Sequence, residues 1–256
     1  MDIITHTLTG LLCGSMVAGV QPKNTGNKFV TVFFGGLGGC LPDIDTISLW
    51  SGFDHYFGNF LHLQDSGRDI YFGKAWYSHH AFFHSIAAII FYLIVLEWFY
   101  KLFSWKFKNS YPNKIFLSFA FAFGYFMHLL EDMPTPGGSW GGINLFWPLQ
   151  NYTGGTGQIW WWNNYDIFLL IFAALVVNIA VLLLSFRFQI NKFSTVIIGF
   201  LGLILVFFQI QSKSDNFNAP VFPSKAERSL EIQKDILGDE LYNFMVKFDK
   251  SVKMHF

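Results

Sequence analysis

Two long stretches without a charged residue constrain this chain more than any other feature of its sequence. One runs from Ile167 to Ser185, with Asn178 as its only strongly polar residue, and the other runs from Phe193 to Ile210. Each approaches the ~20 apolar residues that a helix needs to cross the hydrocarbon core of a bilayer. We therefore expect an integral-membrane protein.

The other apolar segments predict a polytopic, all-α bundle. Segments 83–103 and 115–130 are also typical of spanning helices, whereas 3–20 and 29–42 are weaker candidates. The 29–42 segment is short and rich in glycine, which suits either a closely packed helix or a re-entrant piece. We expect about six spans, with four spans and an embedded hairpin as the alternative.

Positive charge is concentrated in alternate loops. Lys and Arg occur in loops 21–28, 101–114 and 187–192, and none of these loops contains an acidic residue. With six spans they share one side of the membrane, which the positive-inside rule makes cytoplasmic. Both termini and the polar loops 43–80 and 131–165 then face outward.

Composition excludes several other classes of protein. Charged residues make up 13% of the chain, hydrophobic residues make up 52%, and the net charge is zero, whereas an average soluble domain is about 25% charged. No basic block is present that could neutralise nucleic-acid phosphates. Two cysteines without a CxxC pair predict neither a disulfide scaffold nor a cysteine-built zinc site. The expected partner is the lipid bilayer, and the sequence does not indicate an oligomeric state.

The chain divides into three predicted units. Residues 1–212 form the membrane-embedded domain, and residues 213–223, which contain two prolines, form a linker. From residue 224 to residue 256, apolar side chains recur mostly every three or four positions, which predicts an amphipathic helix outside the membrane.

Histidine and aspartate gather at the helix ends that this topology places on the outer face. His128 and Asp132 are four residues apart, as are His80 and His84, so each pair shares one face of a helix. Imidazole and carboxylate groups can bind one divalent ion together, and ligands of this kind without thiolates suit zinc or manganese. The alternative is a set of capped helix ends with buried hydrogen bonds.

The candidate site is the whole set of these side chains. Asp43 and Asp45 flank Ile44, so both carboxylates point the same way in an extended or turn segment. We expect them to act as metal ligands or as a general base, and we expect His80 to contact the substrate. The candidate metal ligands are His6, Asp43, Asp45, His79, His84, His128 and Asp132.

Four short blocks in the first 150 residues resemble the YdjM-like family of membrane-bound metal-dependent hydrolases. In the third block the family pattern is His-Arg-Gly-x-Thr-His-Ser, and here His80 stands at the arginine position, where a protonated imidazole could substitute. The blocks are Thr5-His6, Leu41-Pro42-Asp43-Ile44-Asp45, His79 to Ser85, and His128 to Asp132 followed by Thr135-Pro136-Gly137-Gly138.

The stretch from His128 to Pro136 is also similar to the zinc-dependent phospholipase C and single-strand nuclease superfamily. That resemblance covers one helix, and it implies that His128 and Asp132 bind metal and that the reaction is phosphoester hydrolysis. It does not identify a substrate.

The leading hypothesis is therefore a membrane-bound metal-dependent hydrolase of the bacterial inner membrane. It would use one or two divalent ions, zinc or manganese, to cleave a phosphoester in an amphiphilic or lipid substrate at the outer face. The alternatives are a transporter of divalent ions or protons, a bis-histidine haem protein, and a non-catalytic regulatory membrane protein.

Overall fold

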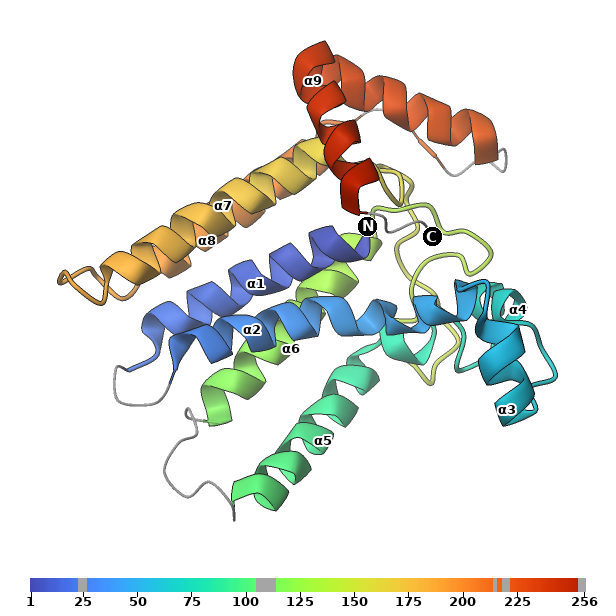
Figure 1. Cartoon of the computed structure of the whole chain (residues 1–256), viewed down its shortest axis with the longest axis horizontal. Coiled ribbons are helices and arrows are strands. Elements are labelled where there is room, and N and C mark those ends of the chain that lie inside the picture. Colours follow the sequence, from blue (N-terminus) through green and yellow to red (C-terminus); the bar gives the residue numbers. More distant parts are fainter. Residues whose placement is uncertain (23–26, 105–113, 214–215, 218–221, 253–256) are drawn as a thin grey trace.

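The structure is a computed structural model that describes residues 1–22, 27–104, 114–213, 216–217 and 222–252. Within these ranges the chain has nine α-helices, short 3-10 and π-helical turns, and two isolated β-bridges in place of strands. The prediction of an all-α membrane bundle is confirmed (Figure 1).

Four of the described helices are long and apolar enough to cross a membrane. They are α1 (Ile3–Val20), α6 (Lys114–Asp132), α7 (Tyr165–Leu184) and α8 (Ser194–Gln211). At 1.5 Å per residue, helices of this length extend about 27–30 Å, which matches the hydrocarbon core of a bilayer. The sequence made α1 a weaker candidate, yet it meets the same criteria as the other three helices.

Two further helices complete the bundle. α5 (Ile86–Ser104) has 19 residues and is strongly apolar, whereas α2 (Lys28–Cys40) has 13 residues and extends only about 20 Å. The 3-10 helix η1 (Leu41–Leu49) follows α2 directly. α2 lies along α1 (Figure 1), and the six-span arrangement stays a prediction.

Glycines let α1, α2 and α6 pack backbone against backbone. A Cβ atom added to Gly10 or Gly124 would collide with the carbonyl oxygen of Gly35, and one added to Gly39 would collide with that of His6. Such close approach of two backbones requires a residue without a side chain on at least one helix at each crossing. The glycine-rich segment is thus a closely packed helix, and the re-entrant alternative stays a hypothesis.

The two ends of the bundle differ in charge. At one end the rings of Phe29 and Phe186 lie 6.2 Å apart, which brings the described parts of loops 21–28 and 187–192 together. Lys23, Lys106 and Lys108 lie outside the described residues. At the other end, the amino group of Met1 at the start of α1 lies 2.7 Å from Asp132 at the end of α6.

Local capping interactions fix the helix ends at this second end of the bundle. Asp2 caps α1 by accepting a hydrogen bond from the Thr5 amide at 2.9 Å, and Ser85 caps α5 by accepting one from the Ala88 amide at 3.1 Å. Beyond α6, the Thr135 amide donates to the Asp132 carbonyl at 3.1 Å. Capping defines where each helix begins or ends, and therefore where the adjacent side chains lie.

The amphipathic segment forms α9 (Phe222–Val252), which is broken at Gly238, where φ is 74°. Glycine adopts this left-handed region without steric cost, so the segment has two helical parts rather than one. α9 packs on α7, and the rings of Phe168 and Phe248 lie 6.1 Å apart. Parts of the predicted linker (214–215 and 218–221) and the last four residues lie outside the described chain.

Candidate metal centre

Four of the predicted ligands meet in one buried cluster. Asp43 comes from η1, His84 from the short 3-10 helix η3 (Phe82–His84), and His128 and Asp132 from α6. One nitrogen or oxygen atom from each lies within 4.8 Å of the corresponding atoms of the others. We call this cluster the four-residue group. All four residues are buried.

The spacing within the four-residue group suits a metal ion. His128 Nε2 lies 3.1 Å from Asp132 Oδ2 and 3.2 Å from His84 Nε2. His84 Nε2 lies 3.3 Å from Asp132 Oδ2, and Asp43 Oδ1 lies 3.5 and 3.6 Å from the two imidazole nitrogens. Ligands about 2.0–2.2 Å from a tetrahedral zinc ion are about 3.3–3.6 Å apart, close to the observed separations.

The tautomer of His128 calls for a proton or a metal ion beside its Nε2 atom. His128 Nδ1 lies 2.8 Å from the carbonyl oxygen of Gly39, which can only accept a hydrogen bond, so Nδ1 carries a proton. In the neutral ring, Nε2 then presents a lone pair to Asp132 Oδ2 at 3.1 Å. Two electron-rich atoms this close repel each other unless a proton or a metal ion lies between them.

The carboxylates add to this demand for positive charge. Asp132 Oδ2 is buried and has no hydrogen-bond partner among the described residues. Burial by itself would raise the pKa of Asp43, but His128 and His84 lower that pKa below its ordinary value, so the carboxyl group is ionised.

His6, predicted as a ligand, lies beside the four-residue group and contacts two of its members. Its ring stacks on that of His128 with centroids 3.8 Å apart, and its Nε2 lies 3.1 Å from Asp132 Oδ1. Its Nδ1 lies 2.8 Å from Glu131 Oε2, and the Thr9 hydroxyl donates to the other oxygen of Glu131. His6 can therefore orient Asp132 and His128, and its role as a metal ligand stays a prediction.

Glu131 is a site residue that the sequence did not single out. It is 4% exposed and bridges His6 and Thr9, so it links α6 to the first turns of α1. An acidic residue near the end of an apolar helix is a weak signal, and only the packing of α1 on α6 reveals its partners.

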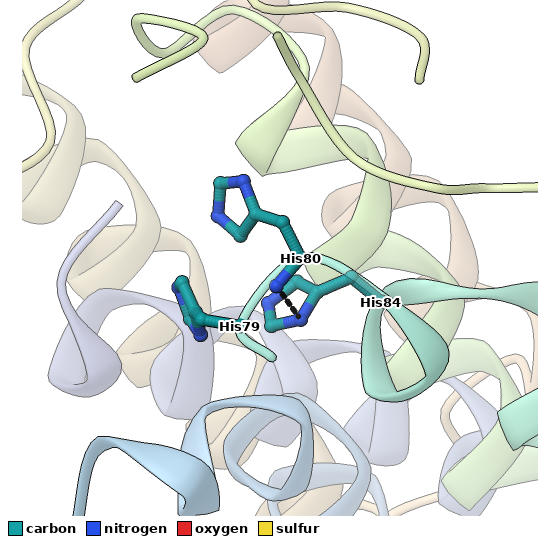
Figure 2. A group of neighbouring side chains, drawn as sticks. All are labelled: His79, His80 and His84. Carbon is teal, nitrogen blue, oxygen red and sulfur yellow. Dashed lines mark hydrogen bonds between the residues drawn. The ribbon is translucent and has the colours of Figure 1, made fainter. Parts of the chain in front are cut away.

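His79, His80 and His84 form a second cluster (Figure 2), which we call the three-histidine group. His79 Nδ1 lies 2.9 Å from Asp45 Oδ1, and His80 Nδ1 lies 3.0 Å from the carbonyl oxygen of Gly142. Partners of this kind fix the orientation of a histidine and leave its Nε2 available as a ligand. Asp45 therefore contacts His79 and can hold it in place, and its predicted role as a ligand or base stays a prediction.

His80 has an unusual backbone conformation at the centre of this group. Its φ is 63°, a region that costs energy for a residue other than glycine and is enriched at functional sites. The conformation lets its amide donate to His84 Nδ1 at 3.3 Å (Figure 2). Burial, together with His79 and His84, lowers the pKa of His80, so a cationic His80 in place of the family's arginine is disfavoured.

Aromatic rings enclose the three-histidine group. Tyr71 stacks on His79 with ring centroids 4.3 Å apart, and Trp140 lies 5.3 Å from His79 and 4.5 Å from His80. Trp140 belongs to the loop that follows α6, whose Asn144 amide donates to the His80 carbonyl at 2.8 Å. This loop therefore covers the group and limits its contact with solvent.

The fold and this centre define a class: a polytopic helical membrane protein with a buried cluster of histidine and aspartate at one end of its bundle. The family model described as "YdjM inner membrane protein" matches residues 1–214, and the chain belongs to that family. No curated protein and no solved structure matches the chain.

Proposed function

We propose that this inner-membrane protein is a metal-dependent hydrolase that cleaves a phosphoester bond in an amphiphilic or lipid substrate. The observation that carries the proposal is the contact between His128 Nε2 and Asp132 Oδ2. They lie 3.1 Å apart in a fully buried site, and the hydrogen bond from His128 Nδ1 to Gly39 turns a lone pair toward the carboxylate. A divalent cation satisfies both atoms.

Asp43, His84, His128 and Asp132 would hold that ion. Nitrogen and carboxylate ligands without sulfur favour zinc, with manganese as the other candidate. A divalent ion held there activates water for attack and stabilises negative charge on a phosphoryl oxygen. Two ionised carboxylates would offset the charge of the ion, which lowers the cost of burying it.

Residues around the ion have separate roles in this proposal. Asp45 holds His79 through a 2.9 Å contact, so the imidazole keeps one orientation toward the substrate. Neutral His80 carries its proton at Nδ1, which faces the carbonyl oxygen of Gly142, so its Nε2 can accept a proton. His80 is therefore a candidate base for the attacking water, and His79, whose protonated form Asp45 would stabilise, is a candidate acid for the leaving group.

An amphiphilic substrate is supported by the surface near the site. The segment from residue 44 to residue 63, which follows Asp43, exposes many large apolar side chains, among them Trp50, Phe60 and Leu61. Phe60 is 79% exposed, and aromatic side chains are enriched where a membrane protein meets the interface. The charge sorting of the loops supports a location of this end at the outer face.

The position of the site favours hydrolysis over ion transport. A transporter places its ion ligands near the middle of the bilayer. Here His6 lies in the first turn or so of α1, and His128 and Asp132 lie in the last turns of α6. The ligands therefore gather at helix ends, closer to the membrane surface than to the middle of the bilayer.

Metal content and activity test this proposal together. The full-length protein is purified in mild detergent, and bound metal is measured in the wild type, His128→Ala and Asp132→Ala, with the exposed His55 replaced by alanine as a matched control. We expect stoichiometric zinc or manganese in the wild type and in His55→Ala, and little in the other two. Near-zero metal in all four proteins would refute the metal site.

Phosphoester hydrolysis is then assayed with the same proteins before and after EDTA treatment. We expect wild-type activity to disappear with EDTA and to return when zinc or manganese is restored. Activity that survives complete removal of metal would refute the mechanism, even if the fold and the cluster are intact.

A further inference from the structure

A small pocket lies beside the three-histidine group, between two loop segments. Its walls include Lys74 and Trp76 from one segment and Asn144, Trp147 and Tyr152 from the other, and its volume is about 240 Å³. This is smaller than the ~300–1,000 Å³ of a typical pocket for a drug-sized ligand. The pocket therefore suits a compact group rather than a whole lipid.

Hydrogen bonds and ring contacts fix the walls of the pocket. The Asn144 amide donates to the His80 carbonyl at 2.8 Å, and the Phe82 amide donates to the Trp76 carbonyl at 3.1 Å. The ring of Trp147 packs against Phe82 with centroids 5.0 Å apart. The pocket is thus tied to the same backbone turn that carries His79 and His80.

The pocket favours an anion. Lys74 is the one charged residue in its lining, and the lining contains no acidic residue. Lys74 has no ion-pair partner among the carboxylates of the described chain. An ammonium group without a carboxylate partner attracts a phosphate group and repels a cationic ligand.

The pocket also calls for a hydrogen-bond donor on its ligand. Asn144 is 3% exposed, and its Oδ1 atom is buried without a hydrogen-bond partner among the described residues. Leaving such a group unsatisfied is unfavourable, and a donor on a ligand would relieve that cost. An ionised phosphate has only acceptors, whereas a hydroxyl group beside it can donate to Asn144.

We infer that this pocket binds a polyol phosphate, a phosphate group joined to glycerol or a sugar. Lys74 binds the phosphate, Asn144 accepts from a hydroxyl group, and the rings of Trp76, Trp147 and Tyr152 pack against the carbon skeleton. The pocket would hold the polar head of the substrate beside the three-histidine group. The connection to catalysis therefore rests on the proposed phosphoesterase function.

Equilibrium dialysis with labelled glycerol 3-phosphate tests this inference on the full-length protein in phosphatidylcholine nanodiscs. We expect saturable binding that weakens about tenfold in Lys74→Ala, the loss expected for one charged hydrogen bond. Lys192→Ala, which removes an exposed lysine at the other end of the bundle, is the matched control and should bind as the wild type does. Absent binding, or equal binding by Lys74→Ala, would overturn the inference.

Asn144→Ala tests the polyol contact separately from the phosphate contact. The wild type should bind glycerol 3-phosphate about tenfold more tightly than inorganic phosphate or phosphocholine, and Asn144→Ala should lose most of this preference. A merely structural role for Asn144 would weaken all three ligands alike. Tighter binding of phosphocholine would contradict the polyol assignment.

Two further arms identify the source of the ligand and separate this inference from the proposed function. If the natural ligand is a lipid headgroup, nanodiscs of phosphatidylglycerol should compete with the labelled probe. If the natural ligand is a free polyol phosphate, these nanodiscs should leave binding of the probe unchanged. Both results agree with a polyol phosphate pocket. Binding is also measured in EDTA and in His128→Ala, where we expect it to persist. Wild-type binding without any hydrolysis would refute only the proposed function.

Discussion

The four-residue group and the three-histidine group share His84 but are built in different ways. The first combines two carboxylates with two imidazoles contributed by η1, η3 and α6. The second has three imidazoles from one turn of the chain and no carboxylate among its ligand atoms. The four-residue group is thus assembled by the packing of distant segments, whereas the three-histidine group is assembled by one local turn of the chain.

The difference in charge has consequences for metal affinity. Two ionised carboxylates in the four-residue group offset the charge of a divalent ion, whereas three neutral imidazoles leave that charge uncompensated. We therefore expect the four-residue group to bind its ion more tightly, and the three-histidine group to bind an exchangeable ion or the substrate.

The largest expected effect comes from breaking the packing beneath the four-residue group. A Cβ atom on Gly124 would meet the carbonyl oxygen of Gly35, so Gly124→Val forces α6 away from α2, at a cost of about 3 kcal/mol or more. We expect a lower melting temperature in detergent and loss of bound metal. Gly58→Ala is the control, because its nearest neighbour would be at 3.8 Å; equal stability of the two variants would contradict the close packing.

The next effect separates the two groups. His128→Ala removes a ligand from the four-residue group alone, and His79→Ala removes one from the three-histidine group alone. We call the four-residue group the tight site. In zinc titrations we expect its affinity in His128→Ala to fall by more than ~10–100-fold, the loss that follows removal of a residue that only orients a ligand. His79→Ala should keep that site, and loss of tight binding in both variants would show that the two groups form a single site.

The sequence predicts the part of the four-residue group that comes from one helix. His128 and Asp132 are four residues apart on α6, so their proximity follows from the helical repeat. The sorting of charge between alternate loops likewise indicated that Asp43 and His84 lie at the same end of the bundle. Helical period and loop composition are local properties, and they are readable without a structure.

Contacts between distant segments could not be predicted in this way. Glu131 gains its role only when α1 packs on α6, since its partners His6 and Thr9 are more than 120 residues away. Lys74 and Asn144 line one pocket because two loops meet over His80. The sequence also did not predict the break in α9 at Gly238, because glycine is tolerated within a helical pattern.

A smaller effect is expected from the partner that orients the three-histidine group. Asp45→Asn keeps the size of the side chain but removes the charge that faces His79 Nδ1 at 2.9 Å. Loss of such a partner costs about 10–100-fold in metal affinity, so we expect weaker binding at the exchangeable site with the tight site unchanged. Asp65→Asn, at an exposed position, serves as the control. If Asp45→Asn instead weakened metal binding at the tight site, Asp45 would support the four-residue group rather than the three-histidine group.

The smallest effect concerns His6, which the sequence predicted as a ligand and which contacts Glu131, Asp132 and His128. His6 lies between Glu131 and Asp132, so His6→Gln and Glu131→Gln remove two parts of one support for Asp132. If His6 acts only through Asp132, each single variant should lower the zinc affinity of the tight site by about tenfold. The double variant should then bind zinc no more weakly than the single variants, because the effects of residues in one network are not additive. If His6 binds the ion itself, His6→Gln should abolish tight binding as His128→Ala does, while Glu131→Gln retains it. Zinc titration of the three variants therefore decides whether α1 supplies a ligand or only holds α6 in position.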